Sequence, residues 1–337
     1  MPEVAVVVLN YNGRALLDRC LQSLTRLCTP ARLVLADNGS SDGSLDYVRQ
    51  YYPQVERLDL GSNLGFAAGY NAALQQVEAV WLALLNNDAA LQPDWLEQLL
   101  AWAAVHPRAA MLGGKLLFDS DSPRQPPILQ SAGASFTDAG TAFEIGWGVE
   151  DRGQHDAPRP VGAIPGAALL VRRDVFMELG GFDASYGAYL EDVDLCWRAW
   201  LRGYEVHYVP AAVAYHRYGA SFGGRAAAGR IRLMQRNRLA NMVKNLELGS
   251  LPWGLAVSAG YDGYRMLEYL RHGETGALRA MLSGSLAFVR QRRGLLARRR
   301  QIQRTRVRRD RELRELGLLV PALSALQEYR RLERVSR

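Results

Sequence analysis

Residues 4–12 run Val4-Ala5-Val6-Val7-Val8-Leu9-Asn10-Tyr11-Asn12, an apolar segment that ends in polar residues. Such a run, rich in β-branched residues, predicts a strand that is buried on both faces, as in a parallel sheet. Further strands are expected near 32–36, 55–60 and 80–85, and helices near 14–27, 43–51 and up to about 77. Strands that alternate with helices at this spacing predict an α/β fold with a mostly parallel, doubly wound sheet.

Polar loops follow three of the expected strands, at Asn10–Asn12, Asp37–Asp42 and Asn86–Asp88. In a doubly wound sheet, ligands bind beyond the carboxyl ends of the strands, so we expect these loops at one ligand-binding edge. The chain has neither a Gly-x-Gly-x-x-Gly pattern after its first strand nor a Gly-x-x-x-x-Gly-Lys-Ser/Thr pattern anywhere. Both absences disfavour a Rossmann dinucleotide site and a P-loop nucleotide site.

The alternation of strands and helices breaks after residue 108. Segments 109–118, 128–136 and 161–171 are expected as strands of a smaller antiparallel part, and from residue 225 the chain is predicted to be helical and basic. A length of 337 residues allows one large domain with an appendage. We therefore divide the chain into an α/β domain, residues 1–224, and a helical, arginine-rich C-terminal region, residues 225–337.

Charge is distributed unevenly between these two parts. Residues 1–224 carry 16 Lys and Arg against 25 Asp and Glu, whereas residues 225–337 carry 25 against 9, a net charge of +16. Such a basic region is either a solvated helix surface or a surface for an anionic membrane or a lipid-diphosphate acceptor, with upstream aromatic residues that suit a membrane. Nucleic acid is a further alternative, disfavoured because no RNP, zinc-finger or helix-turn-helix pattern is present.

Cysteine usage and hydropathy bear on the compartment. Cys20, Cys28 and Cys196 form no Cys-x-x-Cys pair, and we expect core or near-core thiols in a reducing environment. The sequence shows neither a signal peptide nor 18 consecutive apolar residues, which disfavours secretion and membrane spanning. The expected location is the cytoplasm, with peripheral binding to the inner face of the cell membrane if the basic region contacts lipid.

The stretch Glu191-Asp192-Val193-Asp194-Leu195-Cys196-Trp197-Arg198 places three carboxylates within four positions. Val193, Trp197, Trp200 and Leu201 recur at helical spacing and predict one apolar stripe. Asp192 lies off that stripe at the helix start, where the helix dipole favours an anion, so it is a candidate general base. The structural alternative is an acidic first turn that only stabilises the helix.

Two loops supply candidate nucleotide contacts. In the Asp37–Asp42 loop, Asp37 offers an acceptor for a base N–H, and the alternative is an ordinary turn that caps a helix. Asn63, Gly65 and Asn71 lie near a helix start and suit a ribose and phosphates. Gly69 in the same segment is equally compatible with close packing.

Two further residues are candidate metal ligands. Asp88 ends an apolar strand, where a carboxylate can hold a hard divalent cation, Mg or Mn, that bridges a diphosphate. His216 ends another apolar run, and an imidazole can complete such a site. The alternative role for Asp88 is a simple cap after the strand.

Taken in chain order, the motifs of residues 1–224 resemble family 2 glycosyltransferases, the inverting sugar transferases with the GT-A fold. The resemblance rests on Val-Val-Leu-Asn-Tyr-Asn (7–12), Asp-Asn-Gly-Ser-x-Asp (37–42), Asn-x-Gly-Phe-x-x-Gly-x-Asn (63–71), Asn-Asn-Asp (86–88), Gly-Gly-Phe-Asp (180–183), Glu-Asp-Val-Asp-Leu-Cys-x-Arg (191–198) and His-x-x-Gly-x-Ser (216–221). Arg236-Asn237-Arg238 and the basic region resemble the rhamnosyltransferase-like branch.

The resemblance implies roles for individual residues. Asn10 and Asp37 would frame the nucleobase, Asp88 and His216 would ligate the cation, and Asp192 would be the base. The other contacts to the nucleotide sugar would come from Asn12, Asn38, Asp42, Asn63, Gly65, Asn71 and Asn87, and the acceptor side would include Gly166 and Glu191. The family's Asp-x-Asp motif is Asn86-Asn87-Asp88 here, so its first carboxylate is missing. That departure weakens the case for a contact from Asn86 to ribose or metal.

The implied function is metal-dependent, inverting transfer of a sugar from dTDP-rhamnose or a UDP-hexose to a hydroxyl of a glycan or lipid-linked acceptor, in cell-surface polysaccharide synthesis. A sugar-phosphate nucleotidyltransferase is the alternative enzyme, disfavoured because residues 9–13 lack a Gly-rich basic loop. A non-catalytic nucleotide- or nucleic-acid-binding protein is the alternative outside enzymes. The sequence specifies neither the acceptor nor the oligomeric state.

Overall fold

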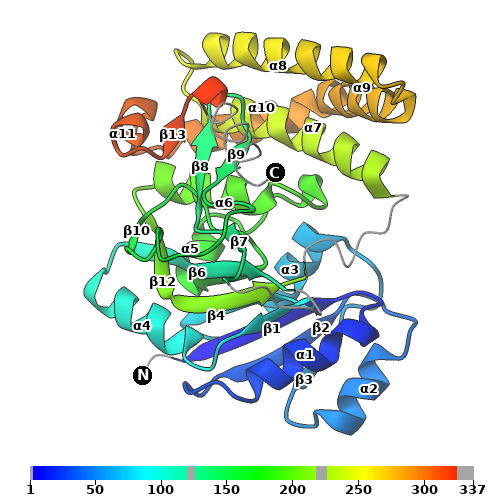
Figure 1. The fold of residues 1–337 in the computed structure, drawn as a ribbon, viewed down its shortest axis with the longest axis vertical. Helices are drawn as coiled ribbons and strands as arrows, with labels where there is room; N and C mark the ends of the chain where they lie inside the picture. The colour runs from blue at the N-terminus through cyan, green and yellow to red at the C-terminus, as the bar shows by residue number, and fades with distance from the viewer. Residues whose placement is uncertain (1–2, 120–125, 218–225, 325–337) are drawn as a thin grey trace.

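The computed structural model describes residues 3–119, 126–217 and 226–324 (Figure 1). Its main sheet has ten strands, eight of which form one continuous path. Side by side along that path lie β10 (Arg159–Pro160), β12 (Glu205–His216), β6 (Ala109–Phe118), β11 (Ala168–Arg172), β4 (Trp81–Asn86), β1 (Val4–Asn10), β2 (Arg32–Asp37) and β3 (Glu56–Asp59). β5 (Ala89–Leu91) pairs with β12, and β7 (Leu129–Ser131) pairs with β6. A second, smaller sheet joins β13 (Leu319–Val320), β8 (Ala134–Thr137) and β9 (Ala142–Glu144).

Strand directions confirm the expected mixed α/β architecture. β1, β2, β3 and β4 are mutually parallel, and β6 is parallel to β12. β11 runs antiparallel between β4 and β6, so it joins the two parallel groups into one sheet.

Helices cover both faces of the main sheet. On one face lie α1 (Arg14–Leu24), α2 (Ser44–Tyr51) and α4 (Trp95–Val105), and on the other α3 (Phe66–Gln75), α5 (Arg173–Glu178) and α6 (Glu191–Leu201). The C-terminal region contains α7 (Ala226–Asn245), α8 (Leu251–Arg271), α9 (Thr275–Arg290), α10 (Arg292–Arg304) and α11 (Asp310–Glu315). Alternate residues of β1 point to opposite faces, as a strand requires. Val6 and Val8 share a core with α1, α2 and α4, whereas Val7 shares a core with α3, α5 and α6.

The strand register brings the predicted polar loops to one edge of the sheet. Asn10 at the end of β1 is the register partner of Asp37 at the end of β2. On the other side of β1, Leu9 is the partner of Asn86 at the end of β4. Three loops that are far apart in sequence therefore start from adjacent strand ends.

The later strands differ from the sequence-based expectations. Segment 128–136 contains two strands, β7 and β8, that belong to different sheets, because the chain turns at Gly133 with a φ of +84°. In segment 161–171 only the last part is a strand, β11, which begins at Ala168. Cys20 and Cys196 are buried as expected, but Cys28 is exposed because it follows the end of α1.

The C-terminal region packs directly on the α/β part. Figure 1 shows α8 and α9 at the end of the molecule opposite α1 and α2, with α7 and α6 between them. Met242 and Leu246 of α7 and Leu319 of β13 belong to the same core cluster as Trp197 of α6. Within the described ranges, none of the helices has the length and apolar character needed to cross a membrane.

Candidate active site

Four polar side chains interlock at the ends of β1, β2 and β4. Asn10 Nδ2 donates to Asp37 Oδ1 (3.1 Å) and to Ser40 Oγ (3.2 Å), and Asn10 Oδ1 accepts from Asn87 Nδ2 (2.8 Å). Asp37 Oδ2 accepts from the Ser40 backbone N–H (2.8 Å). A carboxyl oxygen can accept more than one hydrogen bond, and each Asp37 oxygen accepts one here from Asn10 or Ser40, so both retain capacity for a further donor. Asn10, Asp37 and Asn87 thus come together as predicted from the sequence.

The next loop residues fix the starts of two helices. Asp42 accepts from the backbone N–H groups of Arg14 (2.9 Å) and Ser44 (3.1 Å), at the first residues of α1 and α2. Burial raises the pKa of Asp42, but the hydrogen bonds from Ser44 and Arg14 outweigh burial, and the pKa lies below its usual value. Asn12 Oδ1 accepts from the Ser41 N–H (2.8 Å), so Asn12 also shapes this loop. In the structure, Asn12 and Asp42 hold the loops that border the strand ends.

Asn38 ties the 63–65 loop to the same edge. Its Oδ1 accepts from the Leu64 N–H (2.9 Å), and its Nδ2 donates to Asn63 Oδ1 (3.2 Å) and to the Gly65 carbonyl (3.1 Å). Gly65 has a φ of +79°, a conformation that favours glycine. A Cβ at Gly69 would lie 3.1 Å from Asn38 Nδ2, which supports close packing as the role of that glycine.

Asn71 does not join these residues. Its Nδ2 donates to the Phe182 carbonyl (2.8 Å), and its Oδ1 accepts from the Phe182 N–H (2.9 Å). It lines a cavity of about 400 Å³ whose walls include Leu201 at the C-terminal end of α6 and Arg298 of α10. Asn71 therefore holds the Gly-Gly-Phe-Asp turn, and its amide groups are used there.

The two candidate metal ligands are brought into contact. His216 Nε2 lies 3.1 Å from Asp88 Oδ1, because β5 pairs with β12 directly after Asp88. On the other side of the ring, the Gln130 side-chain amide lies 2.9 Å from His216 Nδ1. Asn86 Nδ2 lies 3.4 Å from His216 Nε2, so Asn86 borders this pair.

This pair suits a divalent cation with few protein ligands. A ligating imidazole is usually oriented by a second group on its other nitrogen, which is the position of Gln130. No group of three or more His, Cys, Asp or Glu side chains suited to a metal occurs among the described residues. Mg²⁺ commonly binds one or two carboxylates and takes its other ligands from phosphates and water. Asp88 and His216 therefore fit a cation that is completed by a diphosphate.

Asp192 lies at the first turn of α6, at the same edge of the sheet. Its Oδ2 accepts from the Gly166 N–H (2.7 Å) and its Oδ1 from the Val193 N–H (2.7 Å). The residue after Gly166, Ala167, accepts at its carbonyl from the N–H of Asn86 (3.0 Å), the last residue of β4. Burial raises the pKa of Asp192 above its usual value, against the lowering effect of the two backbone hydrogen bonds.

Two further carboxyl groups surround Asp192. Glu191 is 5% exposed, and its Oε2 has no hydrogen-bond partner among the described residues. Burial, followed by the charge of Asp192, raises the pKa of Glu191 well above its usual value. Burial also raises the pKa of Glu144 on β9 to about 7, partly offset by a hydrogen bond from Ser131. The site thus combines one hydrogen-bonded carboxylate with neighbours that favour the protonated form.

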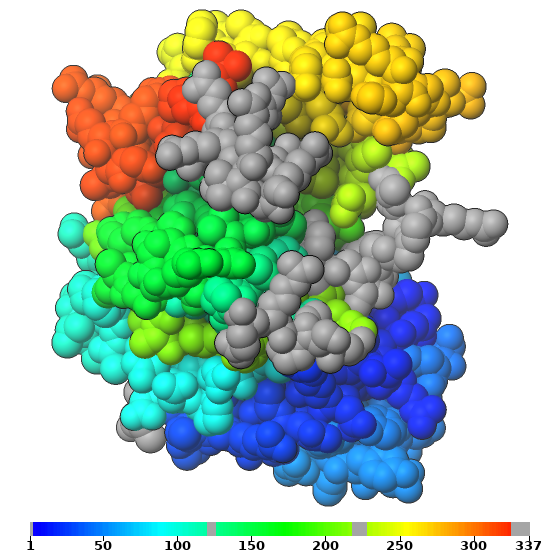
Figure 2. All heavy atoms as spheres, in the orientation of Figure 1, coloured from blue at the N-terminus to red at the C-terminus, as the bar shows by residue number. Residues whose placement is uncertain are grey.

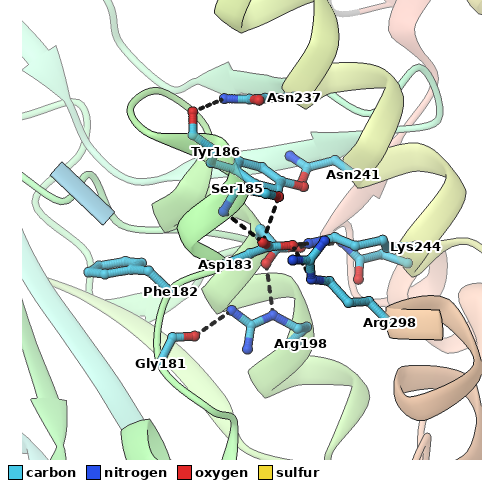
Figure 3. Close-up of polar contacts among 12 residues, drawn as sticks. Gly181, Phe182, Asp183, Ser185, Tyr186, Arg198, Asn237, Asn241, Lys244 and Arg298 are labelled. Carbon is cyan, nitrogen blue, oxygen red and sulfur yellow. Dashed lines mark hydrogen bonds and ion pairs between the residues drawn. The ribbon is translucent and has the colours of Figure 1, made fainter. Parts of the chain in front are cut away.

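α6 is held from its other side by buried ion pairs (Figure 3). Asp194 lies 2.8 Å from Arg198 and 2.8 Å from Lys244 of α7, and Lys244 lies 2.7 Å from Asp183. Burial raises the pKa of Asp194, but Lys244 and Arg198 outweigh burial and lower the pKa to about 2. Val193, Trp197, Trp200 and Leu201 of the expected apolar stripe lie on α6 and are buried, and so is every other residue from Val193 to Leu201, which the sequence did not predict. The cause is α7, which covers the second face of the helix.

Sequence reasoning missed several residues of the site. Ser40 is part of the Asp37–Asp42 motif, but no site role was predicted for it, since a hydroxyl in a polar turn is also an ordinary turn residue. Gln130, Glu144 and Lys244 have no such local signal, because each approaches the site through tertiary packing. The Gly219 and Ser221 positions of the His216 motif lie outside the described residues.

Comparisons with known proteins agree with this geometry. A family model described as "Glycosyl transferase family 2" matches residues 5–180. An N-acetylglucosaminyl-diphospho-decaprenol L-rhamnosyltransferase of Mycobacterium tuberculosis is 36% identical over 238 residues, which cover 65% of this chain and 77% of that protein.

Solved structures add a comparison of the fold. GalNAc-T7, determined with UDP, GalNAc and Mn²⁺, aligns at a TM-score of 0.56 and 16% identity over 72% of this chain and 48% of its own. The mannosyltransferase PcManGT from Pyrobaculum calidifontis, in complex with GDP-Man and Mn²⁺, aligns at a TM-score of 0.54 and 16% identity over 86% of this chain and 87% of its own. At these identities the likeness concerns the fold alone, and it confirms the expected GT-A type.

Proposed function

The chain belongs to the glycosyl transferase family 2 and is a glycosyltransferase, and from this premise we propose that it transfers a sugar from a nucleoside-diphosphate donor to a hydroxyl of a lipid-linked glycan, with inversion at the anomeric carbon. The observation that carries the proposal is the position of Asp192. Its carboxylate accepts a hydrogen bond from the Gly166 N–H, and the next residue, Ala167, accepts one from Asn86 at the end of β4. That strand end lies next to Asp88 and His216. An acceptor-side base and a diphosphate-side ligand pair therefore share one edge of the sheet.

The donor would bind across the ends of β1, β2 and β4. Asp37 and Asn10 offer acceptors and donors to the nucleobase, and the 63–65 loop held by Asn38 borders the ribose and phosphates. Asp88 and His216 would hold a divalent cation, Mg or Mn, which when bound neutralises negative charge on the departing diphosphate. Both solved neighbours were determined with Mn²⁺, which supports this proposal.

Asp192 performs the proton transfer. It accepts the proton of the acceptor hydroxyl as the hydroxyl oxygen forms its bond to C1 of the sugar. The bond from C1 to the phosphate oxygen breaks on the opposite face, and the nucleoside diphosphate leaves with the bonding electrons. A single displacement of this kind inverts the anomeric centre. The hydrogen bonds from the Gly166 and Val193 N–H groups fix the orientation of the Asp192 carboxylate before the acceptor binds.

The relative named above is a rhamnosyltransferase that acts on a decaprenol-linked N-acetylglucosaminyl diphosphate. We therefore propose dTDP-rhamnose as the donor ahead of a UDP-hexose, and a polyprenyl-diphosphate-linked sugar as the acceptor, in the synthesis of a cell-surface polysaccharide. Because such an acceptor is anchored in a membrane, the protein would act from the cytoplasm at the inner membrane face.

The test compares wild type with Asp192→Asn. With dTDP-rhamnose or UDP-glucose, Mn²⁺ and an N-acetylglucosaminyl-diphospho-prenol acceptor, the variant is expected to transfer sugar about 100-fold more slowly, the scale of a lost general base. Donor affinity, measured by calorimetry, should remain within about twofold, because Asp192 lies on the acceptor side. Asp46→Asn, an exposed substitution on α2, is the matched control and should leave both values unchanged. Near wild-type transfer by Asp192→Asn would exclude Asp192 as the base.

A further inference from the structure

The outer surface of α8 is apolar, whereas its inner surface is polar. Facing inward, Asp262 accepts from Arg238 (2.6 Å) and from Gln235 (2.8 Å), and Ser258 Oγ accepts from Arg238 (2.7 Å). Facing outward are Trp253, Leu255, Tyr264, Leu267 and Leu270, each between 42% and 60% exposed. Every other exposed position from Pro252 to Leu270 is proline, alanine or glycine. This polarity is the reverse of that of a helix that borders water.

α9 and α10 extend the surface and add positive charge. The exposed positions of α9 include Leu282, Leu286 and Val289, flanked by Arg279 and Arg290. On α10, Leu296 is exposed beside arginines at positions 292, 293 and 300. No acidic residue lies between Glu274 and Asp310, whereas that stretch holds 11 arginines. Figure 2 shows α8 and α9, yellow to orange, forming the upper end of the molecule.

We propose that the exposed face of α8, α9 and α10 is a docking surface for an anionic lipid bilayer. Tryptophan, tyrosine and leucine side chains partition into the boundary between headgroups and acyl chains, and arginines contact anionic headgroups while their stems lie along apolar surface. A second copy of this chain is disfavoured as the occupant, because two such faces would bring like charges together. The surface is formed by helices that lie on the membrane plane.

Packed helices connect the exposed face of α8, α9 and α10 to the candidate active site. α7 packs between α9 and α6, and Lys244 of α7 forms an ion pair with Asp194 of α6. The inference rests on the proposed function only for the acceptor: a lipid-linked substrate is reached by an enzyme that is already on the bilayer. Binding to lipid itself needs no catalysis, so the two proposals can fail separately.

Vesicle flotation tests the surface with the full chain. Wild type is expected to float with phosphatidylcholine–phosphatidylglycerol vesicles at low salt, and to remain unbound with phosphatidylcholine alone. Arg292→Gln with Arg293→Gln should weaken binding about 30-fold, since each arginine near an anionic surface contributes about fivefold. Leu267→Ser with Leu270→Ser should weaken it at least tenfold. Tyr51→Ser with Val105→Ser removes equally exposed apolar side chains elsewhere and should change nothing.

Three results would overturn the docking surface: no binding to either vesicle, equal binding by all variants, or a salt-resistant dimer that the α8 substitutions dissociate. Melting curves of each variant show whether it is folded. Donor hydrolysis in solution, without vesicles, should be equal in wild type and in all three double variants. If wild type binds the vesicles but does not hydrolyse the donor, the proposed function is contradicted and the docking surface is still supported.

The loop before α6 is held by one buried amide side chain of α7. Asn237 is 1% exposed, and its Nδ2 lies 2.7 Å from the Tyr189 carbonyl, 2.9 Å from that of Ala188 and 3.2 Å from that of Tyr186. Tyr189 and Leu190 have φ values of +70° and +67°, which cost non-glycine residues of order 1 kcal/mol each. Leu190 is the N-cap of α6, two residues before Asp192.

We infer that Asn237 is a positioning residue, which holds residues 186–190 in this conformation and so sets the direction of Asp192. Figure 3 shows Asn237 beside Tyr186, above the ion pairs of Asp183. The loop has no strand or helix of its own after Tyr186 to keep its shape, and the amide of Asn237 supplies the donors that its carbonyl groups need.

Asn237→Asp keeps the shape of the side chain but removes its donors. We expect kcat to fall 10- to 100-fold with donor KM within twofold, and the acid limb of the pH–rate profile to move, because Asp192 would lose its alignment with two N–H groups. In an Asn237→Ala background, Leu190→Gly should restore part of kcat, since glycine adopts a positive φ without strain. Two results would contradict a positioning role and leave Asn237 with a structural role only. One is a loss of donor affinity as large as the loss of kcat, with the acid limb unchanged. The other is a failure of Leu190→Gly to restore kcat.

Discussion

Asp192 is the residue whose protonation should control the rate. Burial raises its pKa above the usual 3.8, and a general base acts only when ionised. The value of kcat/KM should therefore fall as pH decreases through this raised pKa, at a higher pH than an exposed aspartate would give. A pH–rate profile of wild type measures the position of this acid limb.

Glu191→Gln is the matched control for that profile. Burial, followed by the charge of Asp192, raises the pKa of Glu191 well above its usual value, which favours a neutral carboxyl beside an ionised Asp192. Removing a neutral carboxyl should leave the acid limb in place. An acid limb at or below pH 4 in wild type would contradict the buried environment described for Asp192.

Gln130 should affect metal affinity without touching the metal. Its amide fixes Nδ1 of His216 and so directs Nε2 toward Asp88. Gln130→Ala should raise the Mn²⁺ concentration for half-maximal activity about 10- to 100-fold, the usual cost of losing such an orienting group, with activity recovered at saturating metal. Gln92→Ala, which removes a hydrogen bond to the neighbouring Tyr215, should leave the Mn²⁺ requirement unchanged.

At the scale of elements, α6 depends on one lysine from α7. Lys244 is 1% exposed and lies between Asp183 and Asp194. Lys244→Met would remove the cation that two buried carboxylates share and leave Asp194 with Arg198 alone, so the free energy of unfolding should fall by about 3–5 kcal/mol. Urea unfolding measures the loss. Arg311→Met, which breaks an exposed pair with Glu315, should change stability by less than about 1 kcal/mol.

The strands and loops that form the edge of the sheet could be predicted from the sequence, because their signals are local. The apolar runs at β1, β2 and β4 each end in polar residues, and pairing rules place those ends together. The shift of β8 into a second sheet and the burial of α6 on all sides could not be predicted. Both depend on β13 and α7, which are supplied by residues far along the chain.

Contacts between residues that are far apart in the sequence also limit how much of the candidate active site can be predicted. Asp88, His216 and Asp192 are recognisable by residue type and by their position after a strand or at a helix start. Asn237 and Gln130 are ordinary amides in the sequence. Only the packing of α7 and β7 gives them a role, and no local pattern records that packing.

At the scale of the whole molecule, the described residues on both sides of position 225 share one core. Leu319 of β13 and Met242 of α7 pack with Trp197 of α6 in a single cluster. A chain that stops at residue 224 would expose this cluster and lose Lys244 from the ion pairs of α6. We expect it to aggregate or to be digested rapidly in limited proteolysis. A soluble fragment with cooperative unfolding would instead show that residues 1–224 are an independent domain.

The pairing of β13 with β8 also has a consequence for how the protein is made. Phe136 of β8 can pair with Leu319 of β13 only after 183 further residues have been synthesised, and until then β8 has no parallel neighbour. At a translation speed of roughly 5–20 residues per second, that delay is about 10–40 s. During this interval the nascent polypeptide emerges from the ribosome with an unfinished sheet edge, and it is then the natural client of a holding chaperone.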